Sequence, residues 1–122
     1  MNILILDDNR DFLDVLVENL ESEGHSVSAR DSFSGVQEHL QRGQTDLFLL
    51  DVVMPKMDGI EIAKILAQAP RNYALIAISG GATRMSPALG LSAMRALGVD
   101  AVLQKPFSIP TLMKKVAEIS GP

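Results

Sequence analysis

Four short apolar runs, each followed by a segment of different periodicity, constrain the fold of this chain most strongly. They are continuous rather than alternating and lie at residues 3–6, 47–50, 74–78 and 101–103. Continuous runs of this length are typical of strands that helices cover on both faces. A fifth, weaker run at residues 26–29 alternates between polar and apolar side chains, which is typical of an edge strand. The pattern therefore predicts five strands.

Segments of helical period separate these runs, and capping residues mark where the helices begin or end. The first expected helix carries an apolar stripe from Leu13 to Leu20 and ends at Gly24, and the second covers residues 34–40 and ends at Gly43. The third begins at the capping residue Asp58 and ends before Pro70. The fourth runs from Ser86-Pro87 to Gly98, and the last follows Ser108. A helix between each pair of consecutive strands requires parallel strands and right-handed crossovers. The predicted fold class is α/β, a three-layer doubly wound sheet.

Composition excludes several classes of function. The length of 122 residues is typical of one domain, and the formal net charge of −4 does not favour a nucleic-acid surface. The absence of cysteine excludes disulfides and thiolate metal sites. No apolar stretch approaches the roughly 20 residues of a membrane span, and no signal peptide is evident. We therefore expect a cytoplasmic protein with no nucleic-acid or membrane partner. Since aromatic residues make up only 4 %, we expect an aliphatic core.

Chemically useful residues follow four of the predicted strands. Asp7 and Asp8 follow the first, Asp51 the third, Ser79 the fourth and Lys105 the fifth. The carboxyl ends of parallel strands meet at one edge of the sheet, where doubly wound folds place their sites. Neighbouring carboxylates remain ionised when they share a cation, and oxygen ligands favour Mg²⁺ or Mn²⁺ over zinc. A simpler interpretation treats strand-end acids as helix caps or solubilising residues, but their coincidence with Lys105 argues against it.

An aspartate beside such a metal ion can attack a phosphoryl group and form an aspartyl phosphate. The transfer depends on positioning and charge neutralisation. Lys105 could pair with one phosphoryl oxygen, the Ser79 hydroxyl could donate to a second, and the metal could take the third.

Four motifs occur in order at these strand ends: ILILDDN at 3–9, LDVVMPKMDG at 50–59, ISG at 78–80 and KPF at 105–107. With them the whole chain resembles the receiver domain of two-component response regulators. The resemblance implies a flavodoxin-like (βα)5 sandwich with a five-stranded parallel sheet of order 2-1-3-4-5. It also implies that residues 1–122 form a single receiver domain with no output domain.

The resemblance also implies a role for each residue of the motifs. It implies that Asp51 is the phospho-acceptor, and that the metal ligands are Asp8, Asp51 and the backbone carbonyl of Val53, with Asp7 binding through a water molecule. It also implies that Ser79, followed by Gly80, supplies the switch hydroxyl. Lys105 would be the phosphate-sensing lysine, and its bond to Pro106 is expected to be cis. The implied metal is Mg²⁺ or Mn²⁺.

The function implied is that of a signalling phospho-acceptor rather than an enzyme, with self-phosphorylation and self-dephosphorylation chemistry of its own. A sensor histidine kinase or a histidine phosphotransfer protein would supply the phosphoryl group. Phosphorylation would then shift a conformational population. A downstream protein target would read the face formed by the helix after Ser86, the strand at 101–103 and the last helix, or the phosphoryl group would be passed onward.

Three features depart from the family pattern. Val102 stands where the family usually has an aromatic or histidine ring that swings inward, so either Val102 is a plain buried strand residue or switching uses another route, such as the loop after Ser79. In that loop, Arg84 is interpreted as a solvated arginine, with contact to the phosphoryl group or a partner as the sharper alternative. Neither Val53 nor Gly81 can orient a water molecule, which predicts unassisted dephosphorylation.

Two other functions fit parts of the pattern. One is a phosphohydrolase with an aspartate nucleophile. Such enzymes commonly have a second aspartate two residues after the nucleophile, and Val53 at that position argues against this function. A flavodoxin-like or degenerate docking module needs no acidic site, yet the set of Asp7, Asp8, Asp51, Ser79 and Lys105 is intact.

Overall fold

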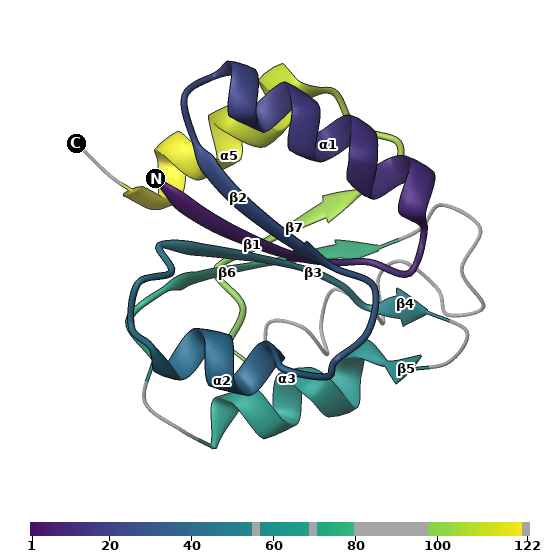
Figure 1. The fold of residues 1–122 in the computed structure, drawn as a ribbon, viewed down its shortest axis with the longest axis vertical. Coiled ribbons are helices and arrows are strands. Elements are labelled where there is room, and N and C mark those ends of the chain that lie inside the picture. The colour runs from purple at the N-terminus through teal and green to yellow at the C-terminus, as the bar shows by residue number, and fades with distance from the viewer. Residues whose placement is uncertain (55–56, 69–70, 80–97, 121–122) are drawn as a thin grey trace.

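The computed structural model describes residues 1–54, 57–68, 71–79 and 98–120. Within these residues five parallel strands form one sheet, in the order β2-β1-β3-β6-β7 (Figure 1). The strands are β1 Asn2–Leu6, β2 Ser26–Arg30, β3 Leu47–Asp51, β6 Ala74–Ser79 and β7 Ala101–Gln104. Counted along the chain, this is the predicted order 2-1-3-4-5, with the alternating strand β2 at one edge. The predicted fold class is confirmed.

Helices cover both faces of the sheet (Figure 1). Helices α1 (Arg10–Ser22) and α5 (Ile109–Ser120) lie on one face, and α2 (Val36–Gln41) and α3 (Gly59–Ala67) lie on the other. Helix α2 begins later than the expected residue 34, because Gly35 precedes it in the left-handed conformation with φ +78°. The helix predicted from Ser86 lies outside the described residues.

Glycine ends two of these helices as expected. Gly24 follows α1 with φ +93°, and Gly43 follows α2 with φ +75°. Residues with a Cβ rarely adopt this left-handed conformation, which turns the chain out of the helix. Both turns lead the chain back toward the amino ends of the next strands.

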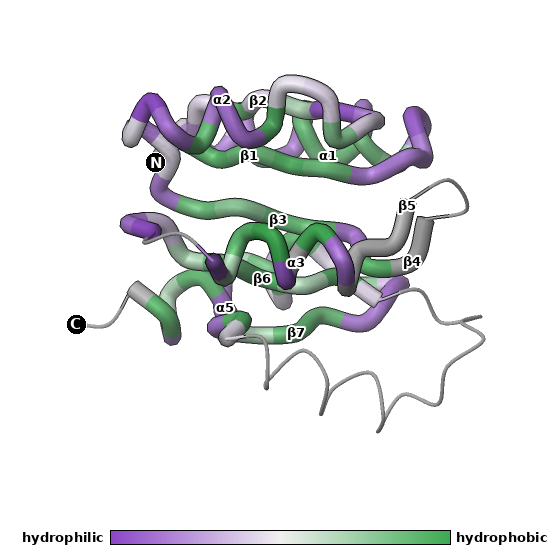
Figure 2. The backbone as a smooth tube through the Cα atoms, turned by 90° about the horizontal axis from the view of Figure 1, so that it is seen from below, coloured by the Kyte–Doolittle hydropathy of each residue, from purple (hydrophilic) through white to green (hydrophobic). Residues whose placement is uncertain are grey.

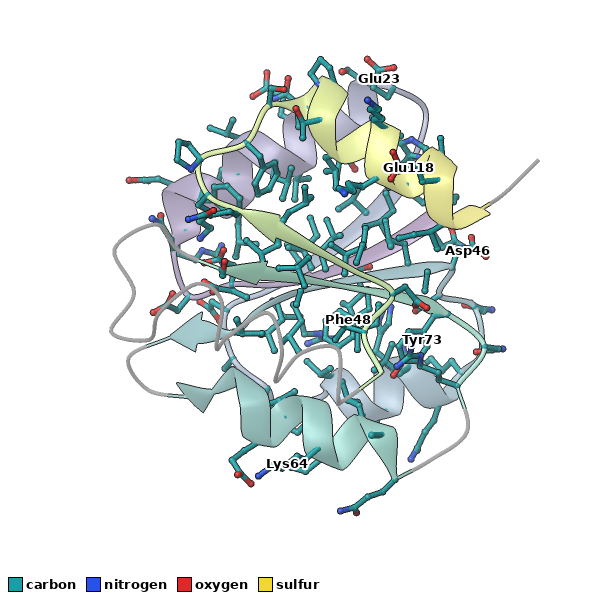
Figure 3. All side chains as sticks on the ribbon, turned by 180° about the vertical axis from the view of Figure 1, so that it is seen from behind. Glu23, Asp46, Phe48, Lys64, Tyr73 and Glu118 are labelled. Atoms are coloured by element: carbon teal, nitrogen blue, oxygen red, sulfur yellow. The ribbon has the colours of Figure 1, made fainter. Side chains whose placement is uncertain are left out.

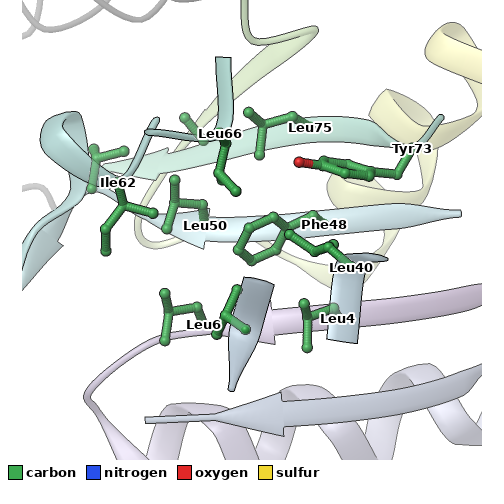
Figure 4. Packing of buried hydrophobic residues seen from close by; sticks show 12 residues of the cluster. Leu4, Leu6, Leu40, Phe48, Leu50, Ile62, Leu66, Tyr73 and Leu75 are labelled. Atoms are coloured by element: carbon green, nitrogen blue, oxygen red, sulfur yellow. The ribbon is translucent and has the colours of Figure 1, made fainter. Parts of the chain in front are cut away.

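Two hydrophobic clusters sandwich the sheet, one on each face. The first joins β1, β3 and β6 to α2 and α3, and Figure 4 shows its side chains filling this layer. The second joins the opposite face of the same strands to α1 and α5. The hydropathy of the backbone in Figure 2 follows this arrangement, with hydrophobic central strands. Among the described residues, no helix is both long and apolar enough to cross a membrane.

The first cluster corrects the expectation of a purely aliphatic core. Phe48 is fully buried there, and its ring meets the ring of Tyr73 edge to face with centroids 6.1 Å apart (Figure 4). The few aromatic residues of this chain are not excluded from its interior, because a single large ring on a central strand fills space beneath two helices. Low aromatic content therefore did not predict where the rings pack.

A short antiparallel pair of strands was not predicted from the sequence. Strand β4 (Val53–Met54) pairs with β5 (Met57–Asp58) directly before α3. Two-residue strands are too short to show periodicity, so the apolar pattern cannot predict them. The pair lies between Asp51 and the start of α3 at Gly59, and Asp58, the residue expected to cap that helix, is the last residue of β5.

Candidate functional site

Backbone hydrogen bonds carry the polar residues to the carboxyl edge of the sheet. The Asp7 N–H donates to the Arg30 carbonyl over 3.1 Å, and the Lys105 N–H donates to the Ser79 carbonyl over 2.8 Å. These bonds extend the strand ladders by one residue past β1 and β7. The side chains that follow the strands are therefore held at a fixed edge.

Two buried carboxylates share one ammonium group at this edge. Asp7 is 0 % exposed and Asp51 is 3 % exposed. The Lys105 Nζ atom lies 2.7 Å from Asp7 Oδ2 and 3.5 Å from Asp51 Oδ2. Buried like charges are costly unless cations compensate them. Within the part of the chain that the structure describes, Lys105 places one positive charge beside these two negative ones, and such a pair of carboxylates is suited to bind a cation.

Asp8 completes a cluster that could hold a metal ion. One carboxylate oxygen from each of Asp7, Asp8 and Asp51 lies within 4.8 Å of the other two. Asp8 is exposed to solvent, which leaves a side from which an ion can enter. The donors are all oxygen atoms, and their three negative charges are balanced by the lysine together with one divalent cation. This donor set fits Mg²⁺ or Mn²⁺.

Asn9 links the acidic cluster to α1. Its N–H donates to Asp7 Oδ1 over 2.9 Å, and its side-chain Oδ1 accepts from the Phe12 N–H over 3.1 Å as the cap of the helix. Asp7 therefore uses Oδ1 for the backbone and Oδ2 for Lys105. The preference of asparagine for the cap position could have identified this role, which the sequence reasoning missed.

The structure places the other predicted residues as follows. Ser79 is the last residue of β6 and is half-buried, and Val53 is the first residue of β4. Val102 is half-buried on β7 and packs against the first core cluster, and the Lys105–Pro106 bond is cis, as expected. Gly80, Gly81 and Arg84 lie outside the described residues. The contacts of the Ser79 hydroxyl and the Val53 carbonyl with a phosphoryl group or metal stay predictions.

Two aromatic rings beside Lys105 were missed by the sequence reasoning. The Lys105 Nζ atom lies 4.1 Å from the centroid of the Phe12 ring. Phe107 meets the Phe12 ring edge to face, with centroids 5.8 Å apart. Because these residues lie on α1 and after β7, no local sequence signal joins them. Their contact becomes visible only in three dimensions.

Comparison with known proteins decides the family. A family model described as the response regulator receiver domain matches residues 3–117. The chain belongs to this family. Receiver domains of two-component response regulators are phosphorylated on an aspartate, bind Mg²⁺ at an acidic pocket and interact with histidine kinases. The family is one of signalling phospho-acceptors.

The chain is similar to curated proteins of different lengths. The response regulator receiver protein CpdR of Brucella abortus is 33 % identical over 118 residues, covering 96 % of this chain and 94 % of CpdR. The alkaline phosphatase synthesis transcriptional regulatory protein PhoP of Bacillus subtilis is 36 % identical over 109 residues, covering 87 % of this chain. This chain spans only 42 % of PhoP and 48 % of the transcriptional regulatory protein CpxR of Escherichia coli.

Solved structures agree on the fold. The signal receiver domain of a DNA-binding response regulator (merR) from Colwellia psychrerythraea has a TM-score of 0.82 at 26 % identity, covering 98 % of each chain. The chemotaxis protein CheY4 of Vibrio cholerae also has a TM-score of 0.82, at 23 % identity, covering 97 % of each chain. The second likeness supports the flavodoxin-like fold alone.

Proposed function

We propose that Asp51 is the phospho-acceptor of this receiver domain. The observation that carries the proposal is the sharing of the Lys105 ammonium by Asp7 and Asp51, 2.7 and 3.5 Å away, beside the carboxylate of Asp8. Asp51 is the member of this cluster that ends the central strand β3. A carboxylate beside a fixed ammonium and a metal-binding cluster is suited to accept a phosphoryl group.

The proposed transfer starts from a phosphohistidine of a sensor kinase or a histidine phosphotransfer protein. An Asp51 carboxylate oxygen attacks the phosphorus and forms an O–P bond. The P–N bond breaks, its electron pair stays on the imidazole nitrogen, and that nitrogen takes a proton from solvent. Lys105 pairs with a phosphoryl oxygen, and the Ser79 hydroxyl is proposed to donate to another.

The proposed metal ligands are Asp8 and Asp51, the Val53 backbone carbonyl, and Asp7 through a water molecule. Mg²⁺ or Mn²⁺ bound there would neutralise charge on the phosphoryl group as it transfers. The chain's own contribution is to hold the carboxylates and the ammonium at the sheet edge, through the ladder bonds at Asp7 and Lys105.

The proposal includes the output of the signal. Residues 1–122 act as one receiver domain in the cytoplasm, and a downstream protein reads the face that includes β7 and α5, or the phosphoryl group is passed onward. Val102 contributes as a half-buried strand residue of that face, packed against the core. Loss of the phosphoryl group to water, without help from a positioned side chain, belongs to the same proposal.

Incubation with acetyl phosphate and Mg²⁺, followed by mass measurement of the intact protein, tests the acceptor. The wild type is expected to gain one phosphoryl group, and the Asp51→Asn variant none. Asp46→Asn, which changes an exposed aspartate at the opposite edge of the sheet, is the matched control and should gain the group normally. An adduct that persists in Asp51→Asn, or no adduct in the wild type, would contradict the proposal; the latter would favour a docking module.

A further inference from the structure

The ammonium group of Lys105 lies over an aromatic ring as well as beside two carboxylates. Its Nζ atom is 4.1 Å from the centroid of the Phe12 ring, well inside the roughly 6 Å reach of a cation–π interaction. The ring is held in turn by Phe107, whose plane is inclined by 84° to it. Phe12 therefore presents a face to the cation while Phe107 meets it edge to face.

Four linked contacts fix the position of the Phe12 ring relative to the acidic cluster. Asp7 accepts from the Asn9 N–H, Asn9 accepts from the Phe12 N–H, the Phe12 ring faces Lys105, and Lys105 donates to the other oxygen of Asp7. The contacts join the start of α1 to the residue after β7. Residues 7–12 therefore place both the Asp7 carboxylate and the face of the Phe12 ring against the same ammonium group.

A lysine needs such a constraint more than most residues. Its ammonium group is carried on a flexible four-carbon stem and is strongly hydrated. A carboxylate contact alone leaves the stem free to move, whereas a ring face restricts the ammonium and excludes water from one side. A purely aliphatic side chain at this position would fill the space without attracting the charge.

We propose that Phe12 is a positioning residue whose ring face holds the Lys105 ammonium group at the oxygens of Asp7 and Asp51. The inference rests on the proposed function, because Lys105 acts there on the phosphoryl group. Phe12 touches neither the phosphoryl group nor the metal in this scheme, and it acts through the lysine alone.

Two substitutions separate positioning from packing. Phe12→Leu keeps an apolar side chain but removes the π face, and Phe12→Tyr keeps the face. Val17→Ala, which truncates another half-buried apolar side chain of α1 away from Lys105, is the matched control. Thermal unfolding of all variants checks that each is folded.

The first measurement is the NMR chemical shift of the Lys105 ε-methylene protons without Mg²⁺ or phosphodonor. The ring current is expected to shift them upfield in the wild type, Phe12→Tyr and Val17→Ala, and the shift should disappear in Phe12→Leu. The second is the rate of phosphorylation by acetyl phosphate with Mg²⁺. Phe12→Leu should be slower by roughly fivefold to thirtyfold, the range that a cation–π interaction of this kind supports, while the other two variants stay within about twofold.

The outcomes distinguish this inference from the proposed function. Equal phosphorylation rates in Phe12→Leu and the wild type, or no upfield shift in the wild type, would overturn the positioning role. Equal slowing in Val17→Ala would also overturn it, since loss of packing would then explain the effect. A wild type that shows the shift but gains no phosphoryl group would overturn the proposed function while leaving the contact between ring and ammonium in place.

Discussion

Aspartates lie at both ends of the central sheet, but their surroundings differ. At the amino ends of the strands, Asp46 Oδ2 accepts from the Asn2 N–H over 2.7 Å, and Asp100 Oδ2 accepts from the Leu75 N–H over the same distance. Figure 3 shows Asp46 at this end of the sheet. Each carboxylate bonds the backbone of a neighbouring strand, and Asp100 also pairs with Arg71 at 3.3 Å.

At the carboxyl ends the acids are gathered together instead. Asp7 and Asp51 are almost completely buried and face the same ammonium group, with Asp8 close by. Their number exceeds that of the cations beside them among the described residues. The same residue type is thus expected to stabilise the fold at one edge and to oppose it at the other, where the excess charge serves ligand binding.

The largest stability effect is expected at the amino edge. Asp100→Ala removes the acceptor of the Leu75 N–H and the partner of Arg71, which should lower the free energy of unfolding by about 1–2 kcal/mol. Urea denaturation measures the change. Asp31→Ala is the control, because Asp31 pairs with Arg10 in an exposed contact at 3.4 Å, and its loss should cost less than about 0.5 kcal/mol. Equal losses in the two variants would contradict the stabilising role of Asp100.

At the carboxyl edge, replacing an aspartate is expected to raise the free energy of unfolding rather than to lower it. Asp51→Asn removes one of two buried negative charges that face Lys105, so in buffer without divalent cations it should raise the free energy of unfolding by about 1 kcal/mol. Mg²⁺ should then stabilise the wild type more than the variant, since binding to the native state adds to its stability. A variant less stable than the wild type without Mg²⁺ would break the contrast between the two edges.

The smallest effect concerns His39, which lines a pocket of about 180 Å³ near the amino ends of β1 and β2. Burial lowers the pKa of His39 below 6.5, and the positive charges of Arg30 and Arg42 lower the pKa further. The unfolded chain therefore binds a proton more readily below pH 6.5, and stability should fall as the pH drops through this value. His39→Gln removes this contribution.

The difference in unfolding free energy between wild type and His39→Gln, measured from pH 7.5 to 5.5, isolates the histidine because the two proteins share all other titrating groups. The wild type should lose more stability than the variant over this interval. Parallel pH profiles would show that the surroundings of His39 do not disfavour its charged form.

Much of the site could be predicted from sequence, because strand ends in a doubly wound sheet bring successive polar residues to one edge. The apolar runs located Asp7, Asp51 and Lys105 on this basis, and the structure brings all three together. A continuous apolar run bounded by polar residues is a local signal, because every residue of a strand covered on both faces is buried. The helix stops at Gly24 and Gly43 were equally local, since a left-handed turn favours a single residue type.

Contacts between distant segments could not be predicted in the same way. The placement of the Phe12 ring over Lys105 depends on how α1 packs beside the residue after β7, and no periodicity encodes that packing. The pairing of β4 with β5 involves too few residues to form a pattern. Burial of Phe48 against Tyr73 depends on the shape of the space beneath α2 and α3, which composition alone does not describe.

The ion pair between Lys105 and Asp7 joins residues 98 positions apart in the chain, and the pair with Asp51 spans 54. During synthesis from the amino end, both acids therefore leave the ribosome long before their lysine. Until β7 has joined the sheet beside β6, the two carboxylates lack the ammonium group that holds them together. Under the proposed function, a chain in which β7 has not yet paired with β6 would not accept a phosphoryl group, and phosphorylation would therefore be restricted to completely folded molecules.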